Sequence, residues 1–590
     1  MGVGNYPLSM KPLFSARIFF CALSLLLFGT RSADAGVIRY WTNSLGGNWF
    51  DPLGWSPNGV PGSADAATIT NIGTYTVLVS TGTVATVTIT IGGASGKQTL
   101  IYGSGAAFTK LSLSNSVVQA NGVLVVTNQG LLGAVTIRQG GELRLDSPGM
   151  QLYDFSITNQ GTLTWSNGSL AVGGSNNQFT YVTNSGLFQI TGDTSMNYGG
   201  GGRSTLYNAG LIRKINGTGT STIGGIDLIN LPSGTVDVQS GTLQISGIAS
   251  NELGGSFTAT APGLMKFAGT DTDAGGVASG TGQFQFFNGT FYLRTNTIPN
   301  LKFVSGDVYV NGATFQQAGA ITNLTMDGAN LRGTNRVAGT VTINSGNLLE
   351  SMTVQPDGQL VLQGSGVQFY GFNLVNRGTV AWSSGSIAFG NTWVSNGGNW
   401  TMTGDASINY GGVGSANFTN AGTVQKIAGT GVSSLSGSTF FNQPSGIVSV
   451  STGTLTMPFN YTNAAGELRL NGGILTAGGT LGMTGGFLDG SGTIGTAASF
   501  DGGTVSPGPI AGLIQFKSSL TLGTNVTLAL DGTGTVPGVS YDQLSVTGAV
   551  AISNCTLQVA SLPNVPAGTT FVIITNTTAN STTGSFNGLA

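Results

Sequence analysis

The sequence predicts an all-β protein, a right-handed parallel β-helix (β-solenoid) with β-rich N- and C-terminal caps. Three observations support this prediction: the composition, a large internal duplication, and a short unit that recurs within each copy. Only 7% of the 590 residues are charged, 98 are glycine, and 40% are hydrophobic. A disordered chain would contain far fewer apolar residues. In stacked coils, equivalent residues lie about 4.8 Å apart, which disfavours like charges.

The first 35 residues are predicted to be a signal peptide. Basic residues precede an apolar run at residues 18–28, and residues 33–35 read Ala-Asp-Ala, the small-x-small pattern of a cleavage site. The run is shorter than the roughly 20 residues that a membrane-spanning helix needs. We therefore expect a protein that is secreted or held at the cell surface, with no transmembrane segment after cleavage.

The composition also excludes several functions. Removal of residues 1–35 takes away three basic residues and one acidic residue, which leaves 17 basic against 21 acidic side chains. Such a chain has no basic patch, so nucleic acid is not an expected partner. The sequence contains no histidine, which excludes Ser-His-Asp and Cys-His catalysis and histidine-bound zinc. No cofactor is predicted.

A long block occurs twice in the chain, at about residues 149–246 and again at about residues 366–457. Gly149 at its start returns as Gly366, and Asp193 in its later part returns as Asp405, after a short deletion in the second copy. Within each copy, an apolar run, an asparagine, a glycine and a second apolar run recur at steps of roughly 20 to 30 residues. Such a step, without helical periodicity, is typical of one coil of a β-solenoid.

The recurring asparagines are expected at equivalent corners of successive coils. There, each side chain can pass a hydrogen bond to the asparagine of the next coil. The asparagines with this structural role are Asn159, Asn184, Asn208 and Asn230 in the first copy, and Asn376, Asn396, Asn420 and Asn442 in the second.

These observations divide the chain into four segments. The signal peptide covers residues 1–35, an N-terminal Trp-rich cap residues 36–75, and the β-helix residues 76–480. A C-terminal β-rich region, complete or cut short, covers residues 481–590. We expect a monomeric rod on the order of 120 Å long. The tryptophans of the cap are Trp41, Trp49 and Trp55.

Motifs at both ends resemble those of secreted bacterial proteins with autotransporter-associated β-strand repeats. The N-terminal motif consists of Trp41, Gly47-Asn48-Trp49, Trp55, Pro61 and Asp65. Gly54 stands where the family usually has asparagine. The C-terminal motifs lie at residues 490–494, 502–508 and 541–548. The resemblance implies a passenger-like surface or secreted protein, and it implies no particular enzymatic activity, because the group shares none.

Carboxylate chemistry is the catalytic alternative that the sequence leaves open. The candidates are Lys266, Asp271, Asp273 and Arg294. Asp271 and Arg294 are separated by close to one coil, and two carboxylates at i and i+2 share one face of a strand. The favoured interpretation is that residues 269–276 form a polar surface loop.

Two further patterns have a functional and a structural interpretation. Asp193 and Asp405 begin Asp-x-Ser-x-Asn segments, which imitate the oxygen spacing of a calcium loop but contain one carboxylate each. We predict structural turns there and no metal site. Trp165 and Trp382 alternate with apolar residues and are expected in the core instead of in a sugar-binding strip.

The leading hypothesis is a non-enzymatic secreted or cell-surface β-helix with a role in adhesion, in a surface layer or as a passenger. Extracellular polysaccharide and cell-surface glycans are the expected partners. The alternatives are a carbohydrate-active β-helix enzyme, either a polysaccharide lyase or a hydrolase, and a glycan-binding module.

Overall fold

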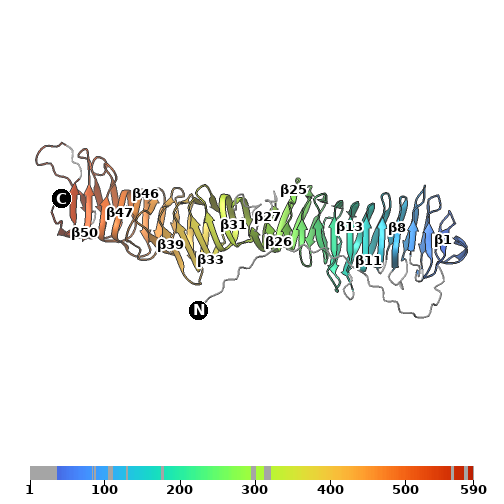
Figure 1. Cartoon of the computed structure of the whole chain (residues 1–590). Helices are drawn as coiled ribbons and strands as arrows, with labels where there is room; N and C mark the ends of the chain where they lie inside the picture. Colours follow the sequence, from blue (N-terminus) through green and yellow to red (C-terminus); the bar gives the residue numbers. More distant parts are fainter. Residues whose placement is uncertain are drawn as a thin grey trace, which may run out of the picture.

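The structure confirms the predicted fold class. The computed structural model describes residues 36–588 apart from 81, 83, 85–87, 104–110, 128–129, 175–178, 294–300, 311–319, 560–563 and 577–581. Strands make up 63% and helix 1%, and the strands stack in parallel as a β-solenoid of about 20 turns. Figure 1 shows a long rod that begins at β1 (Ile38–Trp41). At about 4.8 Å per coil, 20 turns correspond to roughly 100 Å.

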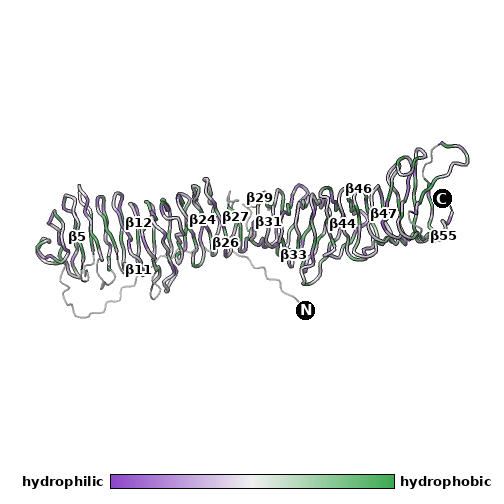
Figure 2. The backbone as a smooth tube through the Cα atoms, turned by 180° about the vertical axis from the view of Figure 1, so that it is seen from behind, coloured by the Kyte–Doolittle hydropathy of each residue, from purple (hydrophilic) through white to green (hydrophobic). Residues whose placement is uncertain are grey.

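Three successive coils of the first repeated block are each built from three short strands. Apolar residues alternate with polar ones along each strand (Figure 2), and the apolar side chains are buried in the rod. Leu206, for example, is buried between Val182 of the preceding coil and Leu228 of the following one. Three successive coils consist of β13 (Tyr181–Asn184), β14 (Leu187–Ile190) and β15 (Ser195–Tyr198); β16 (Thr205–Asn208), β17 (Leu211–Lys214) and β18 (Thr220–Gly224); and β19 (Asp227–Asn230), β20 (Thr235–Val238) and β21 (Thr242–Ser246).

The recurring asparagines lie in two buried, hydrogen-bonded columns. In the first block, Asn159 Nδ2 donates to Oδ1 of Asn184 over 2.6 Å. The same contact links Asn184 to Asn208 and Asn208 to Asn230, each over 2.7 Å. A buried amide with both its donor and its acceptor paired avoids a desolvation cost, so the columns favour one register of the coils. The second column joins Asn376, Asn396, Asn420, Asn442 and Asn463 over 2.7 to 3.3 Å.

Three tryptophans close the N-terminal end of the rod. β1 pairs antiparallel with β3 (Trp55–Ser56), which places Trp41 opposite Trp55. The ring centroids of these two residues lie 5.1 Å apart, and those of Trp49 and Trp55 lie 4.8 Å apart. All three rings are buried. A Cβ atom on Gly54 would come within 2.7 Å of the Trp41 ring, so this packing requires the glycine that replaces the expected asparagine.

The stack of coils extends on both sides of residues 76–480. On the N-terminal side, β4 (Ala66–Ile69) pairs in parallel with β1 and with β6 (Thr88–Ile91). On the C-terminal side, β47 (Leu481–Ile494) pairs in parallel with its neighbours, and such pairing continues to β55 (Thr582–Ser585). The Trp-rich segment and the C-terminal region are therefore the two ends of one solenoid.

Equivalent strands of the two repeated blocks lie in different columns of the rod. The column that contains β15 continues through every intervening coil to β37 (Asn399–Met402). In the duplication, however, β37 is the equivalent of β14, in the same alignment that matches Asp193 to Asp405. The coils between the blocks are shorter, since Leu264 pairs with Gln283 and Phe284 with Leu301. The shorter coils shift the second block by one strand.

Candidate functional site

The carboxylates predicted as catalytic candidates lie inside the rod. Asp271 and Asp273 belong to β24 (Leu264–Asp273), and neither side chain is more than 1% exposed. The prediction that residues 269–276 form a polar surface loop is wrong for residues 269–273, because these pair in register with β26 (Gln283–Leu293) or β22 (Asn251–Leu253). The side chains of a surface loop would face solvent, whereas this strand directs both carboxyl groups inward.

Asp271 is a buried acid with one unpaired oxygen. Asn251 Nδ2 donates to its Oδ1 over 2.7 Å, while its Oδ2 has no hydrogen-bond partner in the described part of the chain. Burial raises the pKa of this carboxyl to about 8, although the hydrogen bond from Asn251 acts in the opposite direction. Asp271 is fully buried, which counts against contact with a polysaccharide.

Asp273 takes the place of an asparagine at a coil corner. In the stack it follows Asn230 and Leu253 at the same position of successive coils. Its Oδ1 accepts a hydrogen bond from the N–H of Gly275 over 2.9 Å. In the same way, Asn159 Oδ1 accepts a hydrogen bond from the N–H of Gly161, which is also two residues further along the chain. Asp273 therefore stabilises a turn.

Of the two basic candidates, Lys266 does not form a catalytic cluster with these acids. Lys266 lies in the column of β21, in register with Gln244 and Gln285, whereas Asp271 lies in the column of β22. The Lys266 ammonium sits 5.1 Å from the centroid of the Phe287 ring. Arg294 lies outside the described residues.

Asp193 and Asp405, the calcium candidates, each pair with a buried lysine of the next coil. Lys214 Nζ lies 2.9 Å from Oδ1 of Asp193, and Lys426 Nζ lies 2.8 Å from Oδ1 of Asp405. The lysine lowers the pKa of each carboxyl. In the described residues, no group of three or more acidic or cysteine side chains could hold a metal ion. At each aspartate, the cation that pairs with the carboxylate is the lysine ammonium group.

Sequence reasoning missed Lys214 and Lys426, which are both fully buried. Besides Asp193, Lys214 Nζ donates to the carbonyl of Gly192 over 3.1 Å and to Ser221 Oγ over 2.9 Å. Lysine is rarely buried in proteins, so the composition of the sequence does not indicate that these two lysines are buried. The duplication could have identified the two lysines, because the lysine, the aspartate and the serine all recur at matching positions of the second block.

The aromatic residues of the repeated blocks divide between the core and the surface. Trp165 and Trp382 are buried, as predicted, and so is Trp400. Trp393 is half exposed, and Tyr198 and Tyr410 are exposed. The six aromatic residues therefore do not form one exposed strip.

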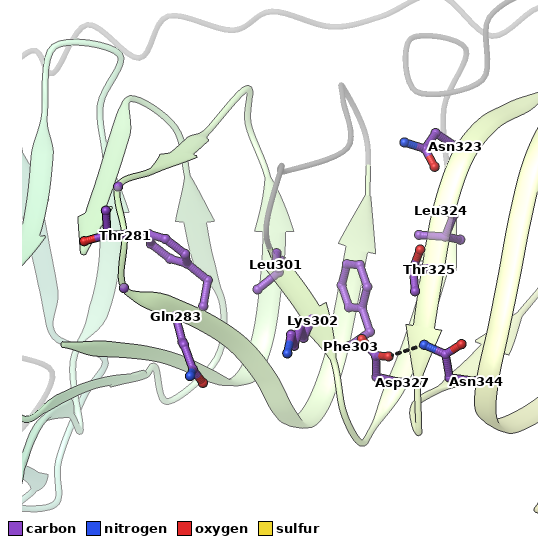
Figure 3. A pocket seen from close by; sticks show the side chains of 13 residues that line it. Thr281, Gln283, Leu301, Lys302, Phe303, Asn323, Leu324, Thr325, Asp327 and Asn344 are labelled. Atoms are coloured by element: carbon purple, nitrogen blue, oxygen red, sulfur yellow. Dashed lines mark hydrogen bonds between the residues drawn. The ribbon is translucent and has the colours of Figure 1, made fainter. Parts of the chain in front are cut away.

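A large hollow lies between the two blocks and has a volume of about 690 Å³. It crosses β26, β27 (Leu301–Phe303), β29 (Ile321–Asp327) and β31 (Thr334–Val354) (Figure 3). Here the wall of the rod is loosely paired: β27 shares three registered positions with β26 but one with β29. The hollow has a size that is typical of ligand sites.

The hollow has a polar rim above buried core residues. Phe284, Leu301, Phe303 and Leu324 lie beneath the hollow, but each is at most 8% exposed and belongs to the core. Hydroxyl, amide, ammonium and carboxyl groups surround the hollow (Figure 3), from Thr281, Gln283, Lys302, Asn323, Thr325, Asp327 and Asn344. These polar groups can exchange hydrogen bonds with the hydroxyl groups of a ligand.

The rim contains one carboxylate. Asn344 Nδ2 donates to Oδ1 of Asp327 over 2.6 Å, and Gln363 Nε2 donates to Oδ1 of Asn344 over 2.7 Å. Glycoside hydrolysis usually requires two carboxyl groups that flank the bond. Asp327 is the one acidic residue among the described lining residues, so these residues do not supply such a pair.

Comparison with protein-family models and with curated proteins found no match for this chain. In the described part of the chain, no helix has the length and apolar character needed to cross a membrane.

Proposed function

We propose that this protein is a non-enzymatic extracellular rod that binds polysaccharide on its side, in an adhesive or surface-layer role. The observation that supports the proposal is the large hollow between the repeated blocks, with a rim rich in hydroxyl and amide groups. Rows of small polar side chains on a stiff solenoid provide an extended surface of the kind that repeat proteins use for binding.

The positions of the acidic side chains support binding in preference to catalysis. Asp271 and Asp273 face the interior of the rod, and Asp327 is hydrogen-bonded on the rim. Export is expected from the signal-like segment at residues 1–35, which lies outside the described residues.

The proposal is tested with purified protein and a panel of neutral and acidic polysaccharides. Binding is measured by calorimetry, and cleavage is measured as newly formed sugar ends. We expect saturable binding without cleavage, and an affinity about tenfold lower when Lys302→Ala and Asp327→Asn are combined. Lys517→Ala, which removes an exposed lysine from a distant coil, is the control and should bind like the parent.

Two results would overturn the proposal. One is the absence of binding to every polysaccharide in the panel. The other is cleavage that disappears with Asp271→Asn, since this would assign catalysis to the buried acid.

A further inference from the structure

A second hollow lies on the outer face of the first repeated block. It has a volume of about 430 Å³ and crosses β13, β16, β19 and β22. Three charged side chains meet there in a chain that has only 7% charged residues. The lining consists of Phe179, Tyr181, Arg203, Thr205, Tyr207, Asp227, Ile229 and Glu252.

Arg203 is held in this hollow by its neighbours. Its Nε donates to Oδ2 of Asp227, and its Nη2 donates to Ser250 Oγ over 3.1 Å. Asp227 is itself buried and accepts hydrogen bonds from the backbone N–H groups of Ala249 and Ser250. The Arg203 side chain nevertheless remains 55% exposed. A guanidinium has five N–H donors, so a fixed and half-exposed one can present donors to a ligand.

Two tyrosine rings are exposed beside this arginine. Tyr181 is 41% and Tyr207 is 36% exposed, and they lie on adjacent coils. The ring of Phe179 contacts the ring of Tyr181 edge to face, with centroids 6.1 Å apart. Such rings provide apolar faces next to hydrogen-bonding groups. Glu252, in register with Ile229, adds an exposed carboxylate.

The second block shows which of these residues the coil itself requires. In the alignment that matches Asp193 to Asp405, the buried asparagines, Lys214 and Ser221 return unchanged. The lining of the hollow does not: Arg203 becomes Ser415, Tyr207 becomes Thr419 and Asp227 becomes Thr439. The second block forms the same parallel coils with these uncharged residues. The arginine, the tyrosine and the aspartate are therefore not needed for the fold.

We infer that Tyr181, Arg203, Tyr207 and Glu252 form a second saccharide site, which takes neutral, hydroxyl-rich chains. Arg203 and Asp227 balance each other's charge, and Glu252 leaves the hollow with a net negative charge, which disfavours acidic polysaccharides. The tyrosine faces can contact the carbon–hydrogen face of a sugar ring, while Arg203 donates to its hydroxyl groups and Glu252 accepts from them. The inference relies on the proposed function only for the general class of ligand.

The test exchanges the lining for the residues of the second block. The variant Arg203→Ser, Tyr207→Thr, Asp227→Thr uses side chains that equivalent coils already accommodate, and it removes the buried carboxylate together with its arginine. Glu252→Gln keeps the shape of the hollow and removes its negative charge. Calorimetry is performed with the hexasaccharides of cellulose, mannan and laminarin as neutral probes and with hexagalacturonate as the acidic probe. Far-ultraviolet circular dichroism checks the fold of each variant.

We expect at least one neutral hexasaccharide to bind the parent protein, and its affinity to fall by about tenfold or more in the triple variant. Glu252→Gln should weaken the same interaction, and the surface control Lys517→Ala should leave it unchanged. The inference is overturned if no neutral probe binds, if the triple variant binds like the parent, or if only hexagalacturonate binds. Since each hollow has its own variant, loss of function at one is distinguishable from loss at the other.

Discussion

Asp271 shows how a single buried side chain can couple the stability of the rod to pH. Its carboxyl is protonated in the folded protein up to a pKa of about 8, whereas in the unfolded chain it ionises with its ordinary pKa of 3.8. The contribution of Asp271 to the free energy of unfolding is fully present below about pH 4 and is lost as the pH rises to about 8. The free energy of unfolding should fall by on the order of 5 kcal/mol over this window because of Asp271.

Asp271→Asn should remove this pH dependence. The amide keeps an oxygen that can accept from Asn251 and carries no ionisable proton. We expect the variant to be more stable than the parent at pH 8 and similar at pH 4, in urea denaturation followed by circular dichroism at both values. Asp542, whose pKa burial raises to about 7, is present in both proteins, so their difference isolates Asp271. The exposed Asp501→Asn is the control, and parallel pH profiles of Asp271→Asn and the parent would contradict the assignment.

At the scale of single residues, the periodicity of the sequence could predict the positions of some side chains but not of others. The asparagine columns were predictable because the same residue returns once per coil and its side chain both donates and accepts. The inward direction of Asp271 follows the same alternation as the buried Met265 and Phe267, but nothing in the sequence indicated that this polar stretch continues the strand. The interpretation of residues 269–273 as a loop followed from their polar composition, which conceals an inward-facing pair of acids.

The buried lysines fix short elements to one another across coils. Lys214, at the end of β17, joins the turn at Asp193 to the start of β18 at Ser221. The pair is asymmetric, because the lysine is fully buried whereas the aspartate is 42% exposed. Removal of the aspartate leaves a buried cation with less compensation, but removal of the lysine leaves a carboxylate that water can solvate.

Asp193→Ala should therefore destabilise the protein more than Lys214→Met does. We expect a loss of about 2 to 3 kcal/mol for the first change and about 1 kcal/mol or less for the second, because methionine fills the apolar part of the lysine site. Chemical denaturation at neutral pH measures both values. Equal losses would indicate that the ion pair has no asymmetric desolvation cost, and Lys517→Ala provides a surface reference.

At the scale of the whole molecule, the stack tolerates coils of different length. Between the blocks the coils shorten, the equivalent strands of the second block lie one column over, and parallel pairing still continues from β1 to β55. The sequence predicted the rod because each coil repeats the same local pattern. The sequence did not predict that equivalent strands of the two blocks lie in different columns. An alignment of the two copies shows insertions and deletions, but it does not show how many strands each coil contains. The large hollow lies in this transition, where β27 and β29 are weakly paired.

A solenoid made of coils in register should accept the loss of one complete coil but not of half a coil. Deletion of residues 377–396 removes one repeat between Asn376 and Gly397 and would place Asn376 next to Asn420 in the column. We expect this variant to fold cooperatively, with a maximum dimension in small-angle X-ray scattering about 5 Å shorter than that of the parent. Deletion of residues 377–386 alone should abolish cooperative unfolding, because the remaining half-coil puts apolar residues out of register with the core. Similar behaviour of the two deletions would show that the stack does not depend on whole coils.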